Sequence, residues 1–327
     1  AGMGTRMKSS LAKVLHPLAG RPLIAHVLDL ATRLAPQHLI TVAGYQSEAV
    51  RAVCEPHGAT CVLQDPQLGT GHTVAQAEPL LAAFTGDVLV LYGDVPLLQL
   101  ETIRSLCQEH SRQDAAVTVL TAFVEAPHGY GRIVRDGQGQ MQRIVEERDA
   151  SAAEQTIREV NSGIYCLRAP FLFTALRRVG SQNAQGEQYL TDVVGIAVAD
   201  RQTVAHVTVP EAQEITGVNT RVDLAHLEAV LRRRCCEALM LDGVTILDPA
   251  TTVVDTSVHI GQDTVVAPQT HILGHSHIGA GCHIGPQVVI QNSTLGDGVR
   301  VEPFCVIRDH AVLAQTTVVA FSNLTSA

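Results

Sequence analysis

The first two thirds of the chain alternate short apolar runs with amphipathic segments. Runs rich in β-branched residues predict strands, and apolar positions three and four residues apart predict helices. The predicted strands span residues 39–42, 88–92, 116–120 and 164–167, and the predicted helices span 22–34, 73–83 and 100–111. Because strands and helices alternate, the pattern indicates an α/β domain with a largely parallel sheet and ligands at the carboxyl ends of its strands.

One long helix follows this domain. Thr220 and Asp223 have the spacing of a capping pair at its start, and Gly243 is the expected stop. We therefore predict a domain over residues 1–219 and a connecting helix over residues 220–242.

After Gly243 the apolar residues recur every six positions. Seven of them are in phase, namely Val254, Ile260, Val266, Ile272, Ile278, Ile284 and Ile290. The register slips by one at Leu295 and resumes through Val301, either Val306 or Ile307, Val312 and Val318. This period predicts a parallel β-helix over residues 243–327, whereas a β-sandwich would alternate every two residues.

Three histidines, His271, His277 and His283, share the six-residue spacing. Each precedes an apolar position that faces inward, so period-two alternation places the histidines outside. We expect them to stack on successive coils as a solvated row, with His275 nearby. A structural zinc site would instead close four ligands around the ion.

Charge and composition narrow the classes of function. The formal net charge of -9 disfavours nucleic acid as a partner. No apolar run of about eighteen residues and no signal-peptide pattern is present, so we expect a cytoplasmic protein with no membrane partner. The eight cysteines include no CxxC pair, which predicts reduced structural thiols rather than a zinc site.

The opening segment is rich in glycine and basic residues. Gly2 allows close approach of the backbone to a ligand, and Arg6 and Lys13 can neutralise phosphate. Met7 stands where the Walker A loop and the dinucleotide fingerprint both need glycine, so neither motif is present. Taken alone, the segment also fits a surface turn.

The motifs in combination resemble a known family. In chain order they are AGMGTRM, LAKVLHPLAGRPL, QLGTGH, LYGDVPLL, GYGRI, IVEERDA, EVNSGIY, NAQGEQYLTD and GVNTR. This order is similar to that of bacterial N-acetylglucosamine-1-phosphate uridylyltransferases, the amino-terminal half of a bifunctional protein whose other half is an acetyltransferase. The resemblance covers essentially the whole chain. It implies a Rossmann-like, GT-A-like nucleotidyltransferase domain, a connecting helix, a left-handed parallel β-helix and a homotrimer.

The resemblance also implies a reaction. N-acetylglucosamine 1-phosphate attacks the α-phosphate of UTP with Mg²⁺ present, forming UDP-N-acetylglucosamine, a precursor for cell-wall synthesis, and pyrophosphate. The attacking phosphate has a second pKa of about 6 and is mostly dianionic at neutral pH, so no general base is needed. Catalysis is then mainly positioning and charge neutralisation.

Roles carry over residue by residue from the resemblance. Asp94 and Asn219 correspond to the Mg²⁺ ligands, and Arg6 and Lys13 to the cations on the triphosphate. The residues expected around the nucleotide are Ala1, Gly2, Lys13, Gln64, Gly69 and Thr70. The residues expected around the sugar are Tyr92, Gly131, Glu146, Asn161 and Tyr189.

Two departures from the family pattern shape the expectations. The family's glycine-rich loop follows a strand, so we expect about ten further residues before Ala1 in the natural protein. The chain ends before the family's catalytic histidine and acetyl-CoA residues. We therefore expect acetylation of glucosamine 1-phosphate from the full-length protein but not from this chain.

Three alternatives stay open. The chain could be a pyrophosphorylase for another sugar phosphate or nucleotide, a non-catalytic nucleotide-sugar sensor, or an acyltransferase acting through the β-helix alone. A sensor would be expected to lose phosphate or metal ligands, yet Arg6, Lys13, Asp94 and Asn219 are all present.

Overall fold

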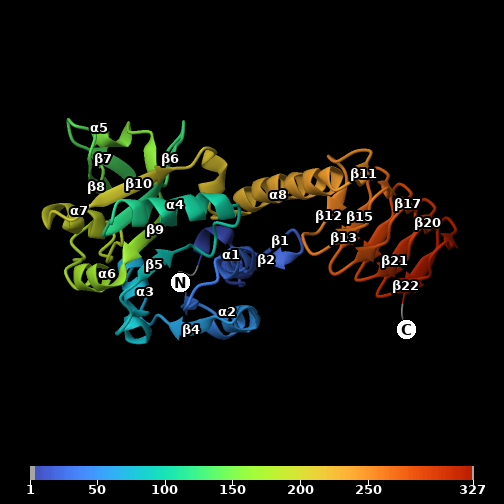
Figure 1. Cartoon of the computed structure of the whole chain (residues 1–327), viewed down its shortest axis with the longest axis horizontal. Helices are drawn as coiled ribbons and strands as arrows, with labels where there is room; N and C mark the ends of the chain where they lie inside the picture. The colour runs from blue at the N-terminus through green and yellow to red at the C-terminus, as the bar shows by residue number, and fades with distance from the viewer. Residues whose placement is uncertain (1–3, 326–327) are drawn as a thin grey trace. The chain divides into compact units, whose positions relative to one another are not determined.

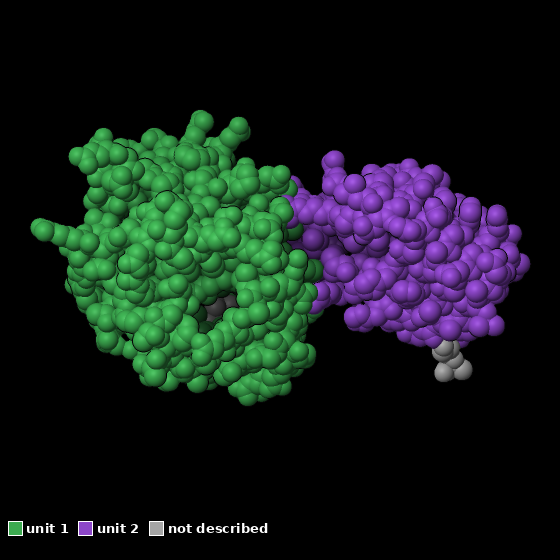
Figure 2. Space-filling view, in the orientation of Figure 1, with its two compact units in different colours: residues 1–16, 22–220 green, residues 17–21, 221–327 purple. Residues whose placement is uncertain are grey.

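The computed structural model describes residues 4–325, and its ribbon is shown in Figure 1. The chain forms two compact units, residues 1–16 with 22–220 and residues 17–21 with 221–327 (Figure 2). The second unit contains both the long helix and the coils. It also takes in residues 17–21, which the sequence alone assigns to the first domain. Among the described residues, no helix has the length and apolar character needed to span a membrane.

The first unit is built around a six-stranded sheet. Its order is β10-β6-β9-β7-β8, and β5 also pairs with β9. The strands are β5 (Asp87–Val90), β6 (Val117–Phe123), β7 (Arg132–Arg135), β8 (Met141–Val145), β9 (Glu159–Arg168) and β10 (Val204–Thr208). A separate two-stranded parallel sheet consists of β3 (Ile40–Ala43) and β4 (Thr60–Leu63).

The prediction of a largely parallel sheet is wrong. In the six-stranded sheet β10 and β6 are parallel, but β9 runs antiparallel to β5, β6 and β7, and β7 runs antiparallel to β8. A parallel connection needs a crossover of a dozen or more residues, usually a helix. Between β6 and β9 the chain has a single short helix, α5 (Ala152–Gln155), so these strands join as antiparallel neighbours.

Helices cover both faces of this sheet. One core packs α6 and α7 against β6 and β9 residues such as Val119 and Tyr165, and the other packs α4 against Leu120 and Cys166. The longer helices are α1 (Leu23–Thr32), α2 (Ser47–Cys54), α3 (Thr70–Ala75), α4 (Leu100–Arg112), α6 (Ala169–Leu176) and α7 (Asp192–Ala199). The predicted helix over residues 73–83 starts earlier and breaks after Ala75, because Pro79 lies in a separate 3₁₀ turn, Glu78–Leu81.

The second unit contains α8 (Arg221–Leu241), β1 (Pro17–Leu18), the first residue of its partner strand β2 (Arg21–Pro22), and a parallel β-helix with three sheets. The first sheet holds β11 (Thr245–Ile246), β14 (Val265–Val266), β17 (His283–Ile284), β20 (Arg300–Val301) and β23 (Thr317–Val318). The second holds β12 (Val253–Val254), β15 (His271–Leu273), β18 (Val289–Gln291), β21 (Val306–Arg308) and β24 (Asn323–Thr325). The third holds β13 (His259–Ile260), β16 (His277–Ile278), β19 (Thr294–Leu295) and β22 (Ala311–Val312).

The predicted register slip is confirmed. Cα partners in neighbouring coils lie 18 positions apart at His271 and Val289 but 17 positions apart at His277 and Thr294. The sequence left Val306 and Ile307 as alternatives. Ile307 is the inward residue, since it is fully buried and pairs with Ile290.

The prediction that these histidines stack in a row on successive coils is wrong. His271, His277 and His283 are exposed, as expected, but they lie on β15, β16 and β17, which belong to three different sheets. One coil takes three hexapeptides, so residues six apart occupy different faces of the same coil. The residue that lies beside His277 in the neighbouring coil is His259, 18 positions earlier, and their ring centroids are 6.1 Å apart.

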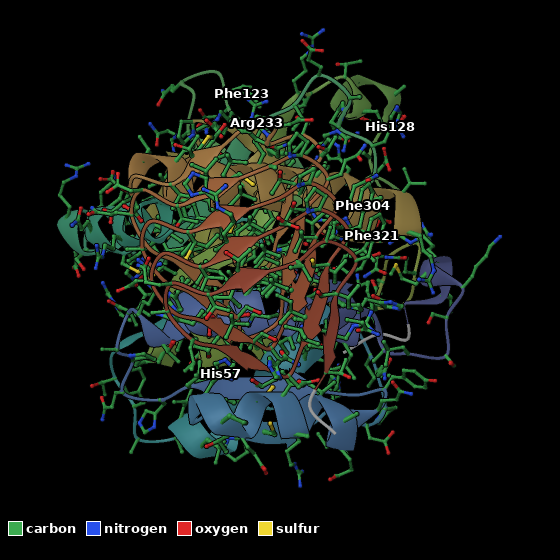
Figure 3. The ribbon with its side chains drawn as sticks, turned by 90° about the vertical axis from the view of Figure 1, so that its right-hand side faces the viewer. His57, Phe123, His128, Arg233, Phe304 and Phe321 are labelled. Carbon is green, nitrogen blue, oxygen red and sulfur yellow. The ribbon has the colours of Figure 1, made fainter. Side chains whose placement is uncertain are left out.

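Two aromatic side chains stack on the outside of the last coils (Figure 3). The rings of Phe304 and Phe321 are 5.0 Å apart and nearly parallel. Both residues have positive φ, 64° and 63°, at turns where glycine or asparagine is more usual. Their stacking is a favourable contact that offsets part of this backbone strain.

Candidate functional site

The glycine-rich loop is held against Lys13. Gly4 has φ 63°, and a Cβ added to it would lie 2.8 Å from the Cβ of Lys13, so only glycine fits this turn. Thr5–Met7 form a 3₁₀ turn whose Met7 side chain is buried. Two residues expected near the nucleotide, Ala1 and Gly2, lie outside the described residues.

Four of the expected residues meet in one cluster. The ammonium of Lys13 donates to the carboxylate of Asp94 and, at 3.2 Å, to Oδ1 of Asn219. A guanidinium N–H of Arg6 donates to the same Oδ1 at 2.9 Å. The structure therefore gathers two cationic side chains and two side chains with acceptor oxygens from segments more than 200 positions apart.

Backbone contacts explain why Asn219 and Asp94 lie close enough to accept hydrogen bonds from the same lysine. Asp94 follows β5, and its carbonyl accepts a hydrogen bond from the N–H of Val218 at 2.9 Å. Gly217 also packs on Asp94, since an added Cβ would lie 3.8 Å from the carboxylate Oδ2. Asn219 thus comes directly after a segment that is fixed to the turn following β5.

The side-chain oxygens of this cluster are of the type that binds a hard divalent cation. A carboxylate oxygen of Asp94 and the amide oxygen of Asn219 already converge on one positive group, the Lys13 ammonium. No group of three or more His, Cys, Asp or Glu side chains within residues 4–325 is arranged to hold a metal. Two protein oxygens are enough for Mg²⁺, which usually keeps water and substrate phosphates as its other ligands.

The second group of expected residues lies in the loop after β4. Gln64 is only 3% exposed, and its amide holds this loop in place. Its Nε2 donates to the carbonyl of Gly69 at 3.1 Å and lies 3.0 Å from Nδ1 of His72, while Thr73 donates to its Oε1 at 3.0 Å. One lone pair of Oε1 is left over for a further hydrogen bond.

This loop is joined to the segment around Tyr189. Gly69 has φ 114°, and an added Cβ would lie 2.6 Å from the carbonyl oxygen of Gln188. The same carbonyl accepts the N–H of Gly71 at 2.7 Å. The hydroxyl of Thr70 accepts the N–H of Leu190 at 3.0 Å.

Three of the expected sugar residues form another cluster. An added Cβ at Gly131 would lie 3.6 Å from both Cβ of Asn161 and Cδ of Glu146, and the N–H of Asn161 donates to the Gly131 carbonyl at 2.9 Å. Thr191 donates to Glu146 Oε1 at 3.2 Å. Burial raises the pKa of the Glu146 carboxyl, and the neighbouring Asp149 carboxylate adds to this rise against the Thr191 hydrogen bond.

Tyr92 lies near both Glu146 and Asp94. Its phenol pKa is raised by burial and then by the negative charges of Glu146 and Asp94. Its ring packs on Gly163, where an added Cβ would lie 2.6 Å from Cε2. The sequence analysis did not single out Gly163, because its predicted strand began at residue 164, whereas β9 begins at Glu159 and contains this glycine.

Tyr189 and Glu146 line a cavity of about 520 Å³. Thr191, which the sequence analysis also missed, is part of the same lining. Tyr92, Gly131 and Asn161 are not among the lining residues, so the structure does not bring all five expected sugar residues into one cavity.

Family comparisons agree with this architecture. Residues 1–166 match the MobA-like NTP transferase domain, and residues 257–292 match the bacterial transferase hexapeptide (six repeats). The solved structure of apo UDP-glucose pyrophosphorylase is similar in fold, with a TM-score of 0.59 at 14% identity, covering 72% of this chain and 96% of that one.

Relatives share much more sequence with the chain. The bifunctional protein GlmU of Pelobacter propionicus is 47% identical over 325 residues, which is 99% of this chain and 71% of the relative. That of Trichlorobacter lovleyi is 45% identical, with the same coverage. With this identity over nearly its whole length, the chain belongs to the bifunctional GlmU family, and it is a nucleotidyltransferase, the N-acetylglucosamine-1-phosphate uridylyltransferase expected from its motifs.

Proposed function

We propose that this site joins the phosphate of N-acetylglucosamine 1-phosphate to the α-phosphate of UTP, with Asp94 and Asn219 as the protein ligands of Mg²⁺. The products are UDP-N-acetylglucosamine and pyrophosphate. The observation that carries the proposal is the convergence of Arg6, Lys13, Asp94 and Asn219.

The residues of this cluster supply positioning and charge. Two polyanions must approach in line, and Arg6 and Lys13 lower the cost by neutralising phosphate oxygens. Bound Mg²⁺ would supply further neutralisation of charge on the phosphates. Because the attacking phosphate is already dianionic, no side chain has to remove a proton.

The other two clusters hold the ends of the substrates. Gln64, Gly69 and Thr70 frame the uracil, with Ala1 and Gly2 assigned to the same role from the motif. The free lone pair of Gln64 Oε1 suits the N–H of uracil, which is a donor.

The sugar residues are Tyr92, Gly131, Glu146, Asn161 and Tyr189. Because burial raises the pKa of Glu146, a larger share of this carboxyl is protonated at a given pH than in an exposed glutamate. A protonated carboxyl can donate as well as accept a hydrogen bond, which suits sugar hydroxyls.

The remaining parts of the proposal concern the whole protein. We assign acetylation of glucosamine 1-phosphate with acetyl-CoA to the full-length bifunctional protein. Hexapeptide repeats favour association, and we propose a homotrimer formed through the β-helix, working in the cytoplasm. Light scattering at micromolar concentration tests the trimer, and a monomer would refute it.

The test of the transfer reaction is pyrophosphate release from UTP and N-acetylglucosamine 1-phosphate with Mg²⁺. Release should require the sugar phosphate and collapse in Asp94→Ala. Asp114→Asn is the matched control, because Asp114 is exposed and its carboxylate pairs with Arg168, which is not one of the four residues of the cluster. Equal turnover with glucose 1-phosphate would favour another pyrophosphorylase, and UTP binding without any release would favour a sensor.

A further inference from the structure

An ion pair joins the neighbouring strands β7 and β8 beside two residues of the sugar cluster. Arg132 is the first residue of β7, and its Nη2 donates to Oε1 of Glu147 at 3.2 Å. Arg132 directly follows Gly131, and Glu147 directly follows Glu146. Because Arg132 lies opposite Val145 in the strand pairing, the ion pair is formed where Gly131 and Glu146 approach each other.

The same two side chains hold the loop before β7. Oε2 of Glu147 accepts the N–H of Gly129 at 2.6 Å, and Oε1 lies 3.4 Å from Nδ1 of the exposed His128, which is labelled in Figure 3. The Arg132 guanidinium also donates to the carbonyl of Tyr130. One ion pair therefore contacts three consecutive residues of the loop that leads into β7.

Burial and charge keep this ion pair in one arrangement. The Arg132 side chain is only 2% exposed, so its charge needs the carboxylate of Glu147 as a partner. Burial opposes ionisation of Glu147, but hydrogen bonds from Gly129 and Arg132 outweigh this effect and lower its pKa, so the carboxyl is charged at neutral pH. The planar guanidinium makes its contacts with Glu147 and Tyr130 in a fixed geometry.

We propose that Arg132 and Glu147 are positioning residues for the sugar, because their ion pair fixes Gly131 and Glu146 relative to each other. The inference rests on the proposed function, which assigns Gly131 and Glu146 to the sugar. Arg132 and Glu147 act through these neighbours rather than by touching substrate. Since small displacements of binding groups are costly, loosening the ion pair should weaken binding of the sugar and leave binding of the nucleotide unchanged.

The experiment compares the affinities of UDP-N-acetylglucosamine and UDP, which differ by the sugar, using isothermal titration calorimetry with Mg²⁺ present. Arg132→Lys keeps the charge but replaces the planar guanidinium by a single ammonium. We expect the Kd of UDP-N-acetylglucosamine to rise about tenfold and the Kd of UDP to change less than about twofold. Glu147→Gln should have the same selective effect. The double variant should bind no more weakly than the more affected single variant, because the two side chains act as one unit.

Strand β7 also supplies a matched control. Arg135 lies three residues after Arg132, and its guanidinium donates to both carboxylate oxygens of Glu159 at 2.8 and 2.7 Å. This second ion pair is also largely buried, with side chains 24% and 8% exposed, but it joins β7 to β9 rather than to β8. Arg135→Lys should therefore lower Tm without changing the ratio of the two affinities.

Three results would overturn the proposal: equal weakening of UDP and UDP-N-acetylglucosamine, unchanged affinities in both single variants, or an equal sugar-specific loss in Arg135→Lys. Hydrogen–deuterium exchange of the wild-type chain gives a test that needs no variant to fold. Peptides covering residues 128–132 should be better protected with UDP-N-acetylglucosamine than with UDP, and equal protection would also overturn the proposal.

Pyrophosphate release tests the transfer reaction separately. If the wild type turns over but Arg132→Lys binds both ligands normally, the positioning role is wrong and the proposed function stands. If the wild type binds UDP-N-acetylglucosamine more tightly than UDP and Arg132→Lys abolishes this difference, the positioning role stands even where no pyrophosphate is released.

Discussion

The side chains of Lys13 and Asp94 form an ion pair, although 81 positions separate them and they are only 19% and 16% exposed. A charge this far removed from water is costly without a partner. The ammonium therefore compensates the carboxylate that we assign to Mg²⁺. If Mg²⁺ binds Asp94 as proposed, Lys13 and the metal would share this carboxylate, which has two acceptor oxygens.

Replacing this lysine should affect turnover strongly. Lys13→Ala removes a cation aimed at the phosphates, and loss of one such electrostatic contact typically lowers kcat by about 10²–10³. Steady-state pyrophosphate release measures the effect. Lys8→Ala is the matched control, because Lys8 is the only other lysine in the sequence and is exposed in the same loop. An equal loss in both variants would mean that general loop charge matters rather than the Lys13 contact.

Gly69 is a second point at which a small change should be costly. Gly69→Ala places a Cβ 2.6 Å from the Gln188 carbonyl oxygen in a backbone conformation with φ 114°. We expect the KM for UTP to rise at least tenfold and the protein to lose about 1–3 kcal/mol of stability. Gly58→Ala separates the two causes, since Gly58 also has positive φ (75°) but nothing lies within 4 Å of its added Cβ. If both variants behave alike, backbone strain alone explains the effect.

The β-helix could be predicted in detail because its signal is local and repeated. The five-residue step from Ile290 to Leu295 stands out against a six-residue period and appears in the structure as a change of pairing distance. The six-residue repeat alone does not reveal how many hexapeptides make one coil. For that reason the sequence could place His271 and His277 outside but assigned them to the wrong neighbours.

The first unit was harder to predict because its decisive contacts are distant in sequence. Local patterns found the strand that leads to Asp94 and the second half of β9, but the direction of β9 depends on its pairing with β5, β6 and β7. Motifs identified Gly69 as a site residue. The reason it must be glycine is the Gln188 carbonyl, 119 positions later, which no local pattern contains.

Glu146 should make stability depend on pH. Burial raises its pKa above 4.5, so between pH 4.5 and the folded pKa the folded protein holds more protons than the unfolded chain. Stability therefore falls as pH rises through this window, because the slope follows the protons bound in the unfolded state minus those in the folded state. Glu146→Gln should flatten this fall in Tm between pH 4.5 and 8.

Asp200 is the control for Glu146, because its pKa is lowered rather than raised. Hydrogen bonds from Arg178 lower the pKa of Asp200, so this carboxyl stabilises the fold at neutral pH and loses its effect as the pH falls. Asp200→Asn should therefore matter more at pH 7 than at pH 3. A Glu146→Gln profile parallel to that of the wild type would refute the burial effect.

Ile272 should contribute strongly to the stability of the β-helix. It is fully buried on β15 and pairs with Val254 in one neighbouring coil and Ile290 in the other. Ile272→Ala leaves a cavity between coils that cannot collapse easily, and such truncations cost about 2–5 kcal/mol. Urea unfolding followed by circular dichroism measures the loss. His271→Ala, on the exposed side of the same strand, should change stability by less than about 0.5 kcal/mol, and a comparable loss there would show that outward side chains also hold the coils together.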